Sequence, residues 1–289
     1  MATEIAGARE SGEALSSPNN PLTEQLPPQP TPSLVSAAEV ADQPALAENP
    51  PWSGWEVIAL AIITLVTMVL CIVVVGYALR PYLAPHAAWS SIITTPEVIV
   101  CGQLLAYVLL FFLMYGLVRN HTDQSVFQAL RWNWPENPSN YLLAGFILEI
   151  CLLPFAYLLP MPKNLPLDEF FKTARDAYIL SVFGIFFAPL FEELFFRGFL
   201  YPVLARRFGM GVSIVATALL FASIHATQLK YSWGPVLVIF IVGLALTTVR
   251  AVKKSVAATV LMHMAYNGTI FIVTFIATDG FRHMDRFNQ

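Results

Sequence analysis

The sequence predicts an all-α membrane protein, a polytopic transmembrane helical bundle of about seven or eight spans. The 289 residues are 56% hydrophobic and 12% charged, whereas soluble domains are about a quarter charged. Several continuous apolar runs are long enough to cross the roughly 30 Å of hydrocarbon in a bilayer. These runs do not alternate polar and apolar residues, as the strands of a membrane barrel do. We therefore expect an integral, multi-pass membrane protein.

Residues 1–50 differ in composition from the rest of the chain. They are rich in Pro, Ala, Ser and Glu, and they carry Arg9 against seven acidic residues. This composition cannot bury a core, so we expect a disordered, acidic tail. The tail lacks the basic and apolar regions of a signal peptide. It could be an idle solvated segment, a tether or a docking segment.

Residues 51–176 are expected to hold the first three spans and their loops. Trp52 and Trp55 mark a membrane interface. The polar stretch 119–140, with its tryptophans, predicts an interfacial turn or a short surface helix. Residues 160–176 carry three prolines and six charged residues, which places them outside the bilayer. The predicted spans are 57–79, 98–118 and 141–159.

Residues 177–278 are expected to form a catalytic core of four further apolar segments, followed by a short polar tail at 279–289. The first segment is longer than a perpendicular span, which predicts tilt or a kink, and Pro189 is the expected kink site. Counting Lys and Arg in alternate loops gives eight on the side of the N-terminal tail and seven on the other side, which slightly favours a cytoplasmic N-terminus. The predicted segments are 178–204, 212 to 225 or 228, 233–249 and 256–277.

Two adjacent acids, Glu192 and Glu193, lie in one of the most apolar parts of the sequence, which has no charge from 179 to 190. A charge at membrane depth costs roughly 2.5–3.5 kcal/mol, so an intramembrane ionisable cluster indicates a functional site. On a helix Glu193 and Arg197 share a face, which predicts an ion pair. Glu192 points about 100° away and is left free for another task.

Two histidines and an amide lie on the later apolar segments. Phe221 and His225 are four residues apart on one segment, and His263 and Asn267 have the same spacing on another. Each pair therefore shares one helix face. Polar groups facing lipid would be costly, so we expect these side chains to face a common interior with Glu192.

Simpler interpretations exist for single residues. An intramembrane histidine is about as often a helix–helix hydrogen bond as a reactive group. Arg197 could be an interfacial anchor, and Glu149 could pair with Arg197 or with a hydroxyl. The three cysteines show neither metal-ligand spacing nor a disulfide framework. We interpret all three as small core residues, namely Cys71, Cys101 and Cys151.

The conjunction of acid, imidazole and amide indicates hydrolysis of an amide bond without a covalent intermediate. A carboxylate in an apolar cavity can act as a general base, and with a histidine it could hold and activate a water. A second histidine and an amide donor could stabilise the oxyanion on the attacked carbonyl. No nucleophile-elbow serine or activated-cysteine pattern accompanies these residues.

At these residues the sequence resembles the CPBP family, which comprises intramembrane CAAX proteases and bacteriocin-processing or self-immunity proteins. The resemblance covers about residues 178–275. The family has three motifs, Glu-Glu-x-x-x-Arg, Phe-x-x-x-His and His-x-x-x-Asn. Here they are Glu192-Glu193-x-x-x-Arg197, Phe221-x-x-x-His225 and His263-x-x-x-Asn267.

The resemblance implies a role for each position. Glu192 and His225 would activate the water, and His263 and Asn267 would form the oxyanion site. Glu193 and Arg197, with Phe221 of the second motif, would support the site structurally. The implied partner is a protein or peptide substrate at the membrane, with or without a lipid anchor, in addition to the bilayer itself.

Two other function classes stay open. The same fold could be a non-catalytic scaffold or a self-immunity protein, or a proton-coupled transporter, although no inverted repeat is visible. Nucleic-acid binding is not expected, because no basic patch with interleaved aromatics is present. One carboxylate and two histidines could bind zinc. The sequence lacks His-x-x-x-His and His-Glu-x-x-His spacings, so we expect no cofactor and metal-free catalysis.

Overall fold

The computed structural model describes residues 48–83, 85–160, 171 and 173–283. Every regular element among these residues is a helix, which confirms the all-α prediction. The expected disorder of the N-terminal tail falls on residues that lie outside this description, apart from the last few.

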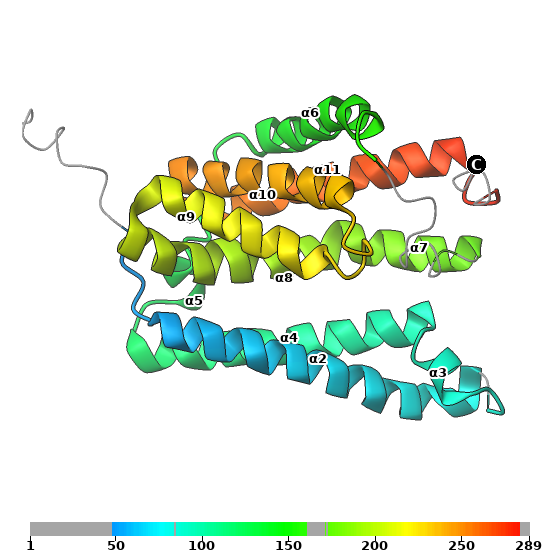
Figure 1. Ribbon diagram of the computed structural model, residues 1–289. Helices are drawn as coiled ribbons and strands as arrows, with labels where there is room; N and C mark the ends of the chain where they lie inside the picture. The colour runs from blue at the N-terminus through cyan, green and yellow to red at the C-terminus, as the bar shows by residue number, and fades with distance from the viewer. Residues whose placement is uncertain (1–47, 84, 161–170, 172, 284–289) are drawn as a thin grey trace, which may run out of the picture. The chain divides into compact units, whose positions relative to one another are not determined.

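The first part of the described chain contributes three long helices and two short ones. Helices α2 and α4 pack side by side (Figure 1). The loop that follows α4 contains α5, so the predicted short surface helix between 119 and 140 is present. The bounds are α2 (Gly54–Leu83), α3 (Trp89–Ile92), α4 (Pro96–His121), α5 (Val126–Ala129) and α6 (Pro138–Tyr157).

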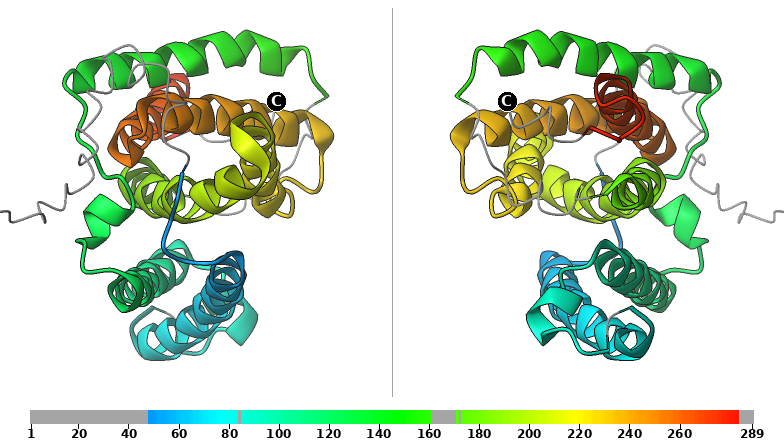
Figure 2. Two further views of the ribbon diagram at one scale, coloured as in Figure 1. Left: turned by 90° about the vertical axis from the view of Figure 1, so that its left-hand side faces the viewer. Right: turned by 90° about the vertical axis from the view of Figure 1, so that its right-hand side faces the viewer.

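The second part is built from one interrupted helix, a reversal and two further helices. Helix α10 lies against both α9 and α11, and α6 packs on α11 (Figure 2). The bounds are α7 (Ala174–Val182), η2 (Phe183–Phe187), α8 (Ala188–Glu193), η3 (Leu194–Leu200), α9 (Tyr201–His225), α10 (Trp233–Lys253) and α11 (Val256–Ala277).

The interruptions η2 and η3 are π-helical, and each ends shortly before a proline. Pro189 and Pro202 have no amide hydrogen, so neither can continue the i to i−4 ladder of an α-helix. A stretch of wider i to i−5 bonding absorbs the missing bond, and such stretches are frequent at functional sites. The irregularity expected at Pro189 is therefore real, and a second one follows at Pro202.

Among the residues that the structure describes, six helices are long and apolar enough to cross a membrane. One of them, 174–225, is not a single rod, because Gly209 has φ 76° and ψ 172° and breaks α9. The chain turns back there (Figure 1). The two arms correspond to the fourth and fifth predicted spans, so counting the arms separately gives seven helical segments that run along the described bundle.

The outer surface of these helices is apolar, as contact with lipid requires. Large side chains such as Leu65 and Phe112 are about two-thirds exposed. The prediction for the cysteines was right for Cys71, which is buried, and wrong for Cys101 and Cys151, which are exposed. The physical reason is that hydrocarbon surrounds a membrane bundle, so an apolar residue need not face the core.

Candidate active site

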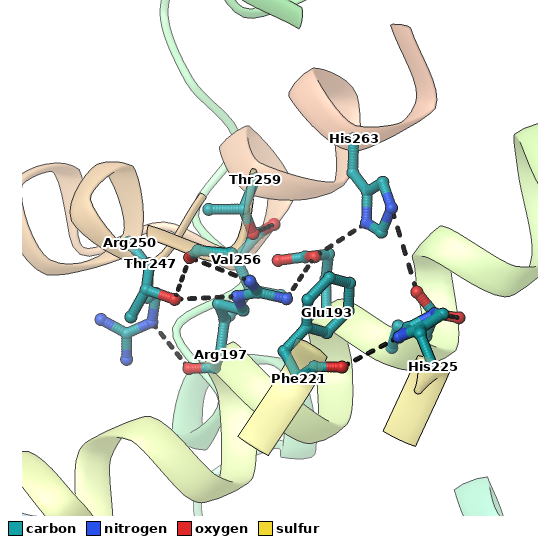
Figure 3. A network of polar contacts seen from close by, with 11 residues as sticks. Glu193, Arg197, Phe221, His225, Thr247, Arg250, Val256, Thr259 and His263 are labelled. Atoms are coloured by element: carbon teal, nitrogen blue, oxygen red, sulfur yellow. Dashed lines mark hydrogen bonds and ion pairs between the residues drawn. The ribbon is translucent and has the colours of Figure 1, made fainter. Parts of the chain in front are cut away.

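The motif residues come from three helical regions that meet inside the second half of the chain (Figure 3). Glu192 and Glu193 end α8, and η3 follows at once with Arg197. His225 ends α9, while His263 lies in the first half of α11. The widened turns of η2 and η3 flank the two acids on either side.

Glu193 and Arg197 form the predicted ion pair, with Arg197 Nη1 2.8 Å from Glu193 Oε1 and both side chains fully buried. The remaining guanidinium donors reach Gly243 O at 3.2 Å and Thr247 Oγ1 at 3.3 Å. The guanidinium carbon also lies 4.5 Å from the centre of the Phe221 ring. Arg197 is therefore not an interfacial anchor, and the pair is locked between α10 and α9.

His263 is held by the same carboxylate. Its Nδ1 lies 2.9 Å from Glu193 Oε1, and His263 is 4% exposed. An ionised carboxylate only accepts hydrogen bonds, so Nδ1 carries the hydrogen. The other ring nitrogen, Nε2, lies 3.9 Å from Glu192 Oε2. Glu193 therefore sets which nitrogen of His263 faces Glu192.

His225 approaches Glu192 in the same way. Its Nδ1 lies 2.9 Å from the carbonyl oxygen of Phe221, which only accepts, so Nδ1 donates. Its Nε2 lies 4.0 Å from Glu192 Oε1. Both distances to Glu192 are too long for direct hydrogen bonds and suit a bridging water. Glu192 and His225 are 18% and 20% exposed at the side chain, in contrast to buried Glu193.

Asn267 lies one helical turn after His263 and makes a different contact. Its Nδ2 donates to Gly184 O of η2 at 2.7 Å. The amide nitrogen keeps a second hydrogen for another acceptor. The structure thus brings six of the seven predicted residues into one contact network and places the seventh at its edge, against η2.

Several supporting residues were not predicted from the sequence. Thr247 and Gly243 of α10 bind Arg197. Tyr107 of α4 is buried and stacks on Phe191, with ring centres 4.5 Å apart. Each is an ordinary apolar-segment residue in the sequence, and no spacing links α4 or α10 to the acidic motif. Only the packing of those helices reveals the contacts.

Glu149 on α6 stands apart from this network. It is buried, and its carboxylate is within hydrogen-bonding reach of the Tyr266 hydroxyl. Of the two simple interpretations considered from the sequence, the neighbouring Tyr266 favours pairing with a hydroxyl. Arg197 has no bond to Glu149, because its donors are engaged by Glu193 and α10.

Glu192 and the two histidines include donor types that zinc uses. Among the described residues, no group of three or more His, Cys, Asp or Glu side chains is arranged to hold a metal ion. Metal-free catalysis stays a prediction.

Residues 174–269 match the family model described as Type II CAAX prenyl endopeptidase Rce1-like. This part of the chain is an Rce1-like domain. The Rce1-like domain covers about a third of the chain and contains all three motifs. No curated protein and no solved structure matches the chain.

The match of residues 174–269 to the Rce1-like model agrees with the resemblance described from the motifs. Together with the six apolar helices, it makes the chain an integral, multi-pass membrane protein. The helices α2, α4 and α6 precede the Rce1-like domain and lie outside the matched residues.

Proposed function

We propose that this protein is an intramembrane endopeptidase in which Glu192 and His225 activate a water to hydrolyse a peptide bond. The observation that carries the proposal is the convergence of two imidazole Nε2 atoms on one carboxylate, at 3.9 and 4.0 Å. Such gaps accommodate one water between acceptor atoms. The partial exposure of Glu192 and His225 leaves a route for the water and the substrate.

The steps follow from the positions of the acceptors. Glu192, assisted by His225, accepts a proton while the water oxygen attacks the carbonyl carbon of the substrate. The carbonyl π-electrons move onto its oxygen, giving a tetrahedral oxyanion. The carbon–nitrogen bond then breaks, and the proton held by Glu192 passes to the leaving amine. Water is consumed, and the products are a carboxyl and an amine.

His263 would stabilise the oxyanion through Nε2. Because Nδ1 is bonded to Glu193, Nε2 donates only when the ring is protonated. The proposal therefore requires an imidazolium at His263 when the oxyanion forms. Asn267 would add the second hydrogen of its amide, the one not used by Gly184.

The first test compares membranes containing wild-type protein with membranes containing Glu192→Gln or His225→Ala protein. Proteome-wide mapping of cleaved peptide termini identifies the substrate, and its cleavage rate is then measured. We expect losses of roughly 10²–10⁴-fold, the usual contribution of a positioned general base. Glu149→Gln, another buried carboxyl of the bundle, is the matched control and should cleave at the wild-type rate.

The proposal would be contradicted if Glu192→Gln protein folds, inserts into the membrane and still cleaves its substrate at the wild-type rate. Protection or binding that persists in such a variant, without any cleavage, would instead indicate a scaffold or immunity protein. The same terminus mapping would show which peptides at the membrane are cleaved and whether they carry a lipid anchor.

Asn267→Ala tests the oxyanion role separately. Loss of one oxyanion donor typically lowers kcat by about 10²–10³-fold. The bond to Gly184 contributes about 1 kcal/mol to stability, so the variant should stay folded. Cleavage rate and thermal unfolding are measured on the same sample. An unchanged kcat would limit Asn267 to a structural contact with η2.

A further inference from the structure

Residues just before α2 pack against η3, the π-helical turn that follows the two acids. Trp52 is fully buried, its indole N–H donates to Phe199 O at 3.1 Å, and its ring stacks on that of Phe199 at 4.3 Å. Arg206 of α9 donates to Pro50 O at 2.8 Å and to Trp52 O at 3.2 Å. We call the segment 48–52 the clasp.

The clasp begins with an acid held by two arginines. Glu48 Oε1 lies 2.8 Å from Arg250 Nη1, and Glu48 Oε2 lies 3.2 Å from Arg131 Nε. Arg250, on α10, is 1% exposed, and the Glu48 side chain is 10% exposed. A buried cation of this kind needs its partner, since removing one partner leaves an uncompensated charge.

Arg250 also reaches the backbone of η3. Its Nε donates to the carbonyl oxygen of Arg197 at 3.0 Å. In the local helical pattern that carbonyl would accept from Tyr201 or Pro202, but the Tyr201 N–H bonds to Phe196 O. Pro202 has no N–H to offer. The Arg250 side chain therefore supplies the bond that the main chain lacks.

Arg197, whose carbonyl oxygen is held by Arg250, also organises the candidate site through its side chain. Arg197 binds Glu193, and Glu193 binds His263 through Nδ1. A continuous chain of polar contacts thus runs from Glu48 through Arg250 to the imidazole beside Glu192, as Figure 3 shows from Arg250 onward. Nothing in the three motifs requires Glu48 or Arg250.

We propose that Glu48 and Arg250 are positioning residues of the candidate active site, and that the clasp holds η3 in the conformation that orients Glu193 and His263. The inference rests on the proposed peptidase function and extends it to Glu48, which lies outside the Rce1-like domain, and to Arg250, which lies inside that domain but outside its three motifs. Neither Glu48 nor Arg250 touches the reacting atoms, so both act through Arg197.

Removing the side-chain donor is the direct test. Arg250→Met eliminates the bond to Arg197 O, and Glu48→Gln weakens the hold on Arg250. A displacement of about 1 Å at reacting groups can cost about 10²-fold in rate. We expect kcat on the substrate identified by terminus mapping to fall about 10- to 100-fold for Arg250→Met and less for Glu48→Gln. KM should not change, because no substrate contact is lost.

Exchanging the charges of residues 48 and 250 distinguishes two roles of the ion pair: orienting the candidate active site, or only attaching the clasp to α10. In the triple variant Glu48→Arg, Arg131→Gln and Arg250→Glu, the ion pair between 48 and 250 is restored with its direction reversed, and the repulsion that Arg131 would exert on an arginine at 48 is removed. A carboxylate at 250 still cannot donate to Arg197 O. We expect the thermal unfolding temperature of this variant to recover relative to Arg250→Met while kcat stays low. A triple variant with wild-type kcat would overturn the proposal.

Two matched controls and one independent readout complete the design. Lys253→Gln removes an exposed cation from the same helix, and Glu56→Gln removes an acid just beyond the clasp. Both should leave kcat unchanged. In nitrogen-15 spectra of imidazole-labelled protein, Arg250→Met should move the His263 signals and Lys253→Gln should not. Unmoved His263 signals in folded Arg250→Met protein would also overturn the proposal, without needing a substrate.

Glu192→Gln protein is assayed beside these variants so that the two ideas fail separately. If Glu192→Gln protein cleaves the substrate at the wild-type rate, both the peptidase function and the clasp proposal are contradicted. If Glu192→Gln protein does not cleave while Arg250→Met protein has wild-type kcat, only the clasp proposal is contradicted. If Arg250→Met does not fold, Arg250→Lys, which keeps the charge, is tested in its place and should show an intermediate kcat.

Discussion

At the scale of the residue, two neighbouring acids are assigned to different tasks by one step of helical rotation. Glu193 is fully buried and bonded to Arg197 and His263. Glu192, about 100° around the helix, keeps a partly exposed carboxylate between two Nε2 atoms. The Glu193 carboxylate is fully buried and its charge is paired with Arg197, so we assign the proposed reactive role to the partly exposed Glu192.

Glu193→Gln should be strongly destabilising, by about 3–5 kcal/mol, because it leaves the Arg197 charge buried without its partner. Unfolding of the protein in mixed detergent micelles measures the free energy. The control is Glu97→Gln, whose partner Arg175 is 3.0 Å away with its side chain 72% exposed. The Glu97 side chain is itself 19% exposed, and a pair that reaches solvent in this way contributes about 0–1 kcal/mol. Equal losses for the two variants would contradict the buried-pair interpretation.

At the scale of the element, the long segment 174–225 is shaped by positions where an ordinary α-helix cannot continue. Pro189 and Pro202 each follow a π-helical stretch, and these stretches place Gly184 O and Arg197 O where side chains from other helices bond them. Gly209 then reverses the chain, so that α9 returns His225 to the level of Glu192. The irregularities thus set the geometry of the candidate site.

Gly209→Ala should destabilise the fold by about 1–3 kcal/mol, because φ 76° with ψ 172° is a region that essentially only glycine adopts. A Cβ at this position would meet no atom within 4 Å, so the cost comes from the backbone and not from a clash. Gly211→Ala is the control, since it is equally open and helical. That change should stabilise by about 0.8–1 kcal/mol. The same sign for both variants would contradict this account.

At the scale of the whole molecule, the described bundle exposes many large apolar side chains on its outside and buries the ion pair of Glu193 with Arg197 inside. The N-terminal start of α2 and the end of α11 lie at opposite ends of the helices (Figure 1). Seven passes through a membrane have this consequence, whereas six would return the chain to its starting side. The number of passes is therefore measurable without a structure.

We expect reporter fusions before residue 48 and after residue 283 to report opposite sides of the membrane. A reporter at the Gly209 reversal should share the side of the N-terminal fusion, because four passes separate them. The charge count of the loops, eight against seven, slightly favours the cytoplasm for that side. Two terminal fusions on the same side would show that the arms of 174–225 do not cross as a pair.

The sequence by itself determined the helical class, the positions of the long helices and the identity of the motif residues. Long apolar runs leave a chain no other way to satisfy its backbone in lipid, and a charge such as Glu192 or Arg197 is conspicuous among them. Helical spacing was enough to predict the Glu193–Arg197 pair, because both residues lie on one segment.

Only the tertiary structure decided which separate segments meet. Three contacts join elements that are distant in sequence: the bond between Glu193 and His263, the hydrogen bond from Arg197 to Thr247, and the ion pair of Glu48 with Arg250. The exposure of Cys101 and Cys151 likewise depends on which helix face meets lipid. In a bilayer the outside of the bundle is as apolar as its core, so hydrophobic pattern alone does not tell the two faces apart; shape and polar contacts between helices do.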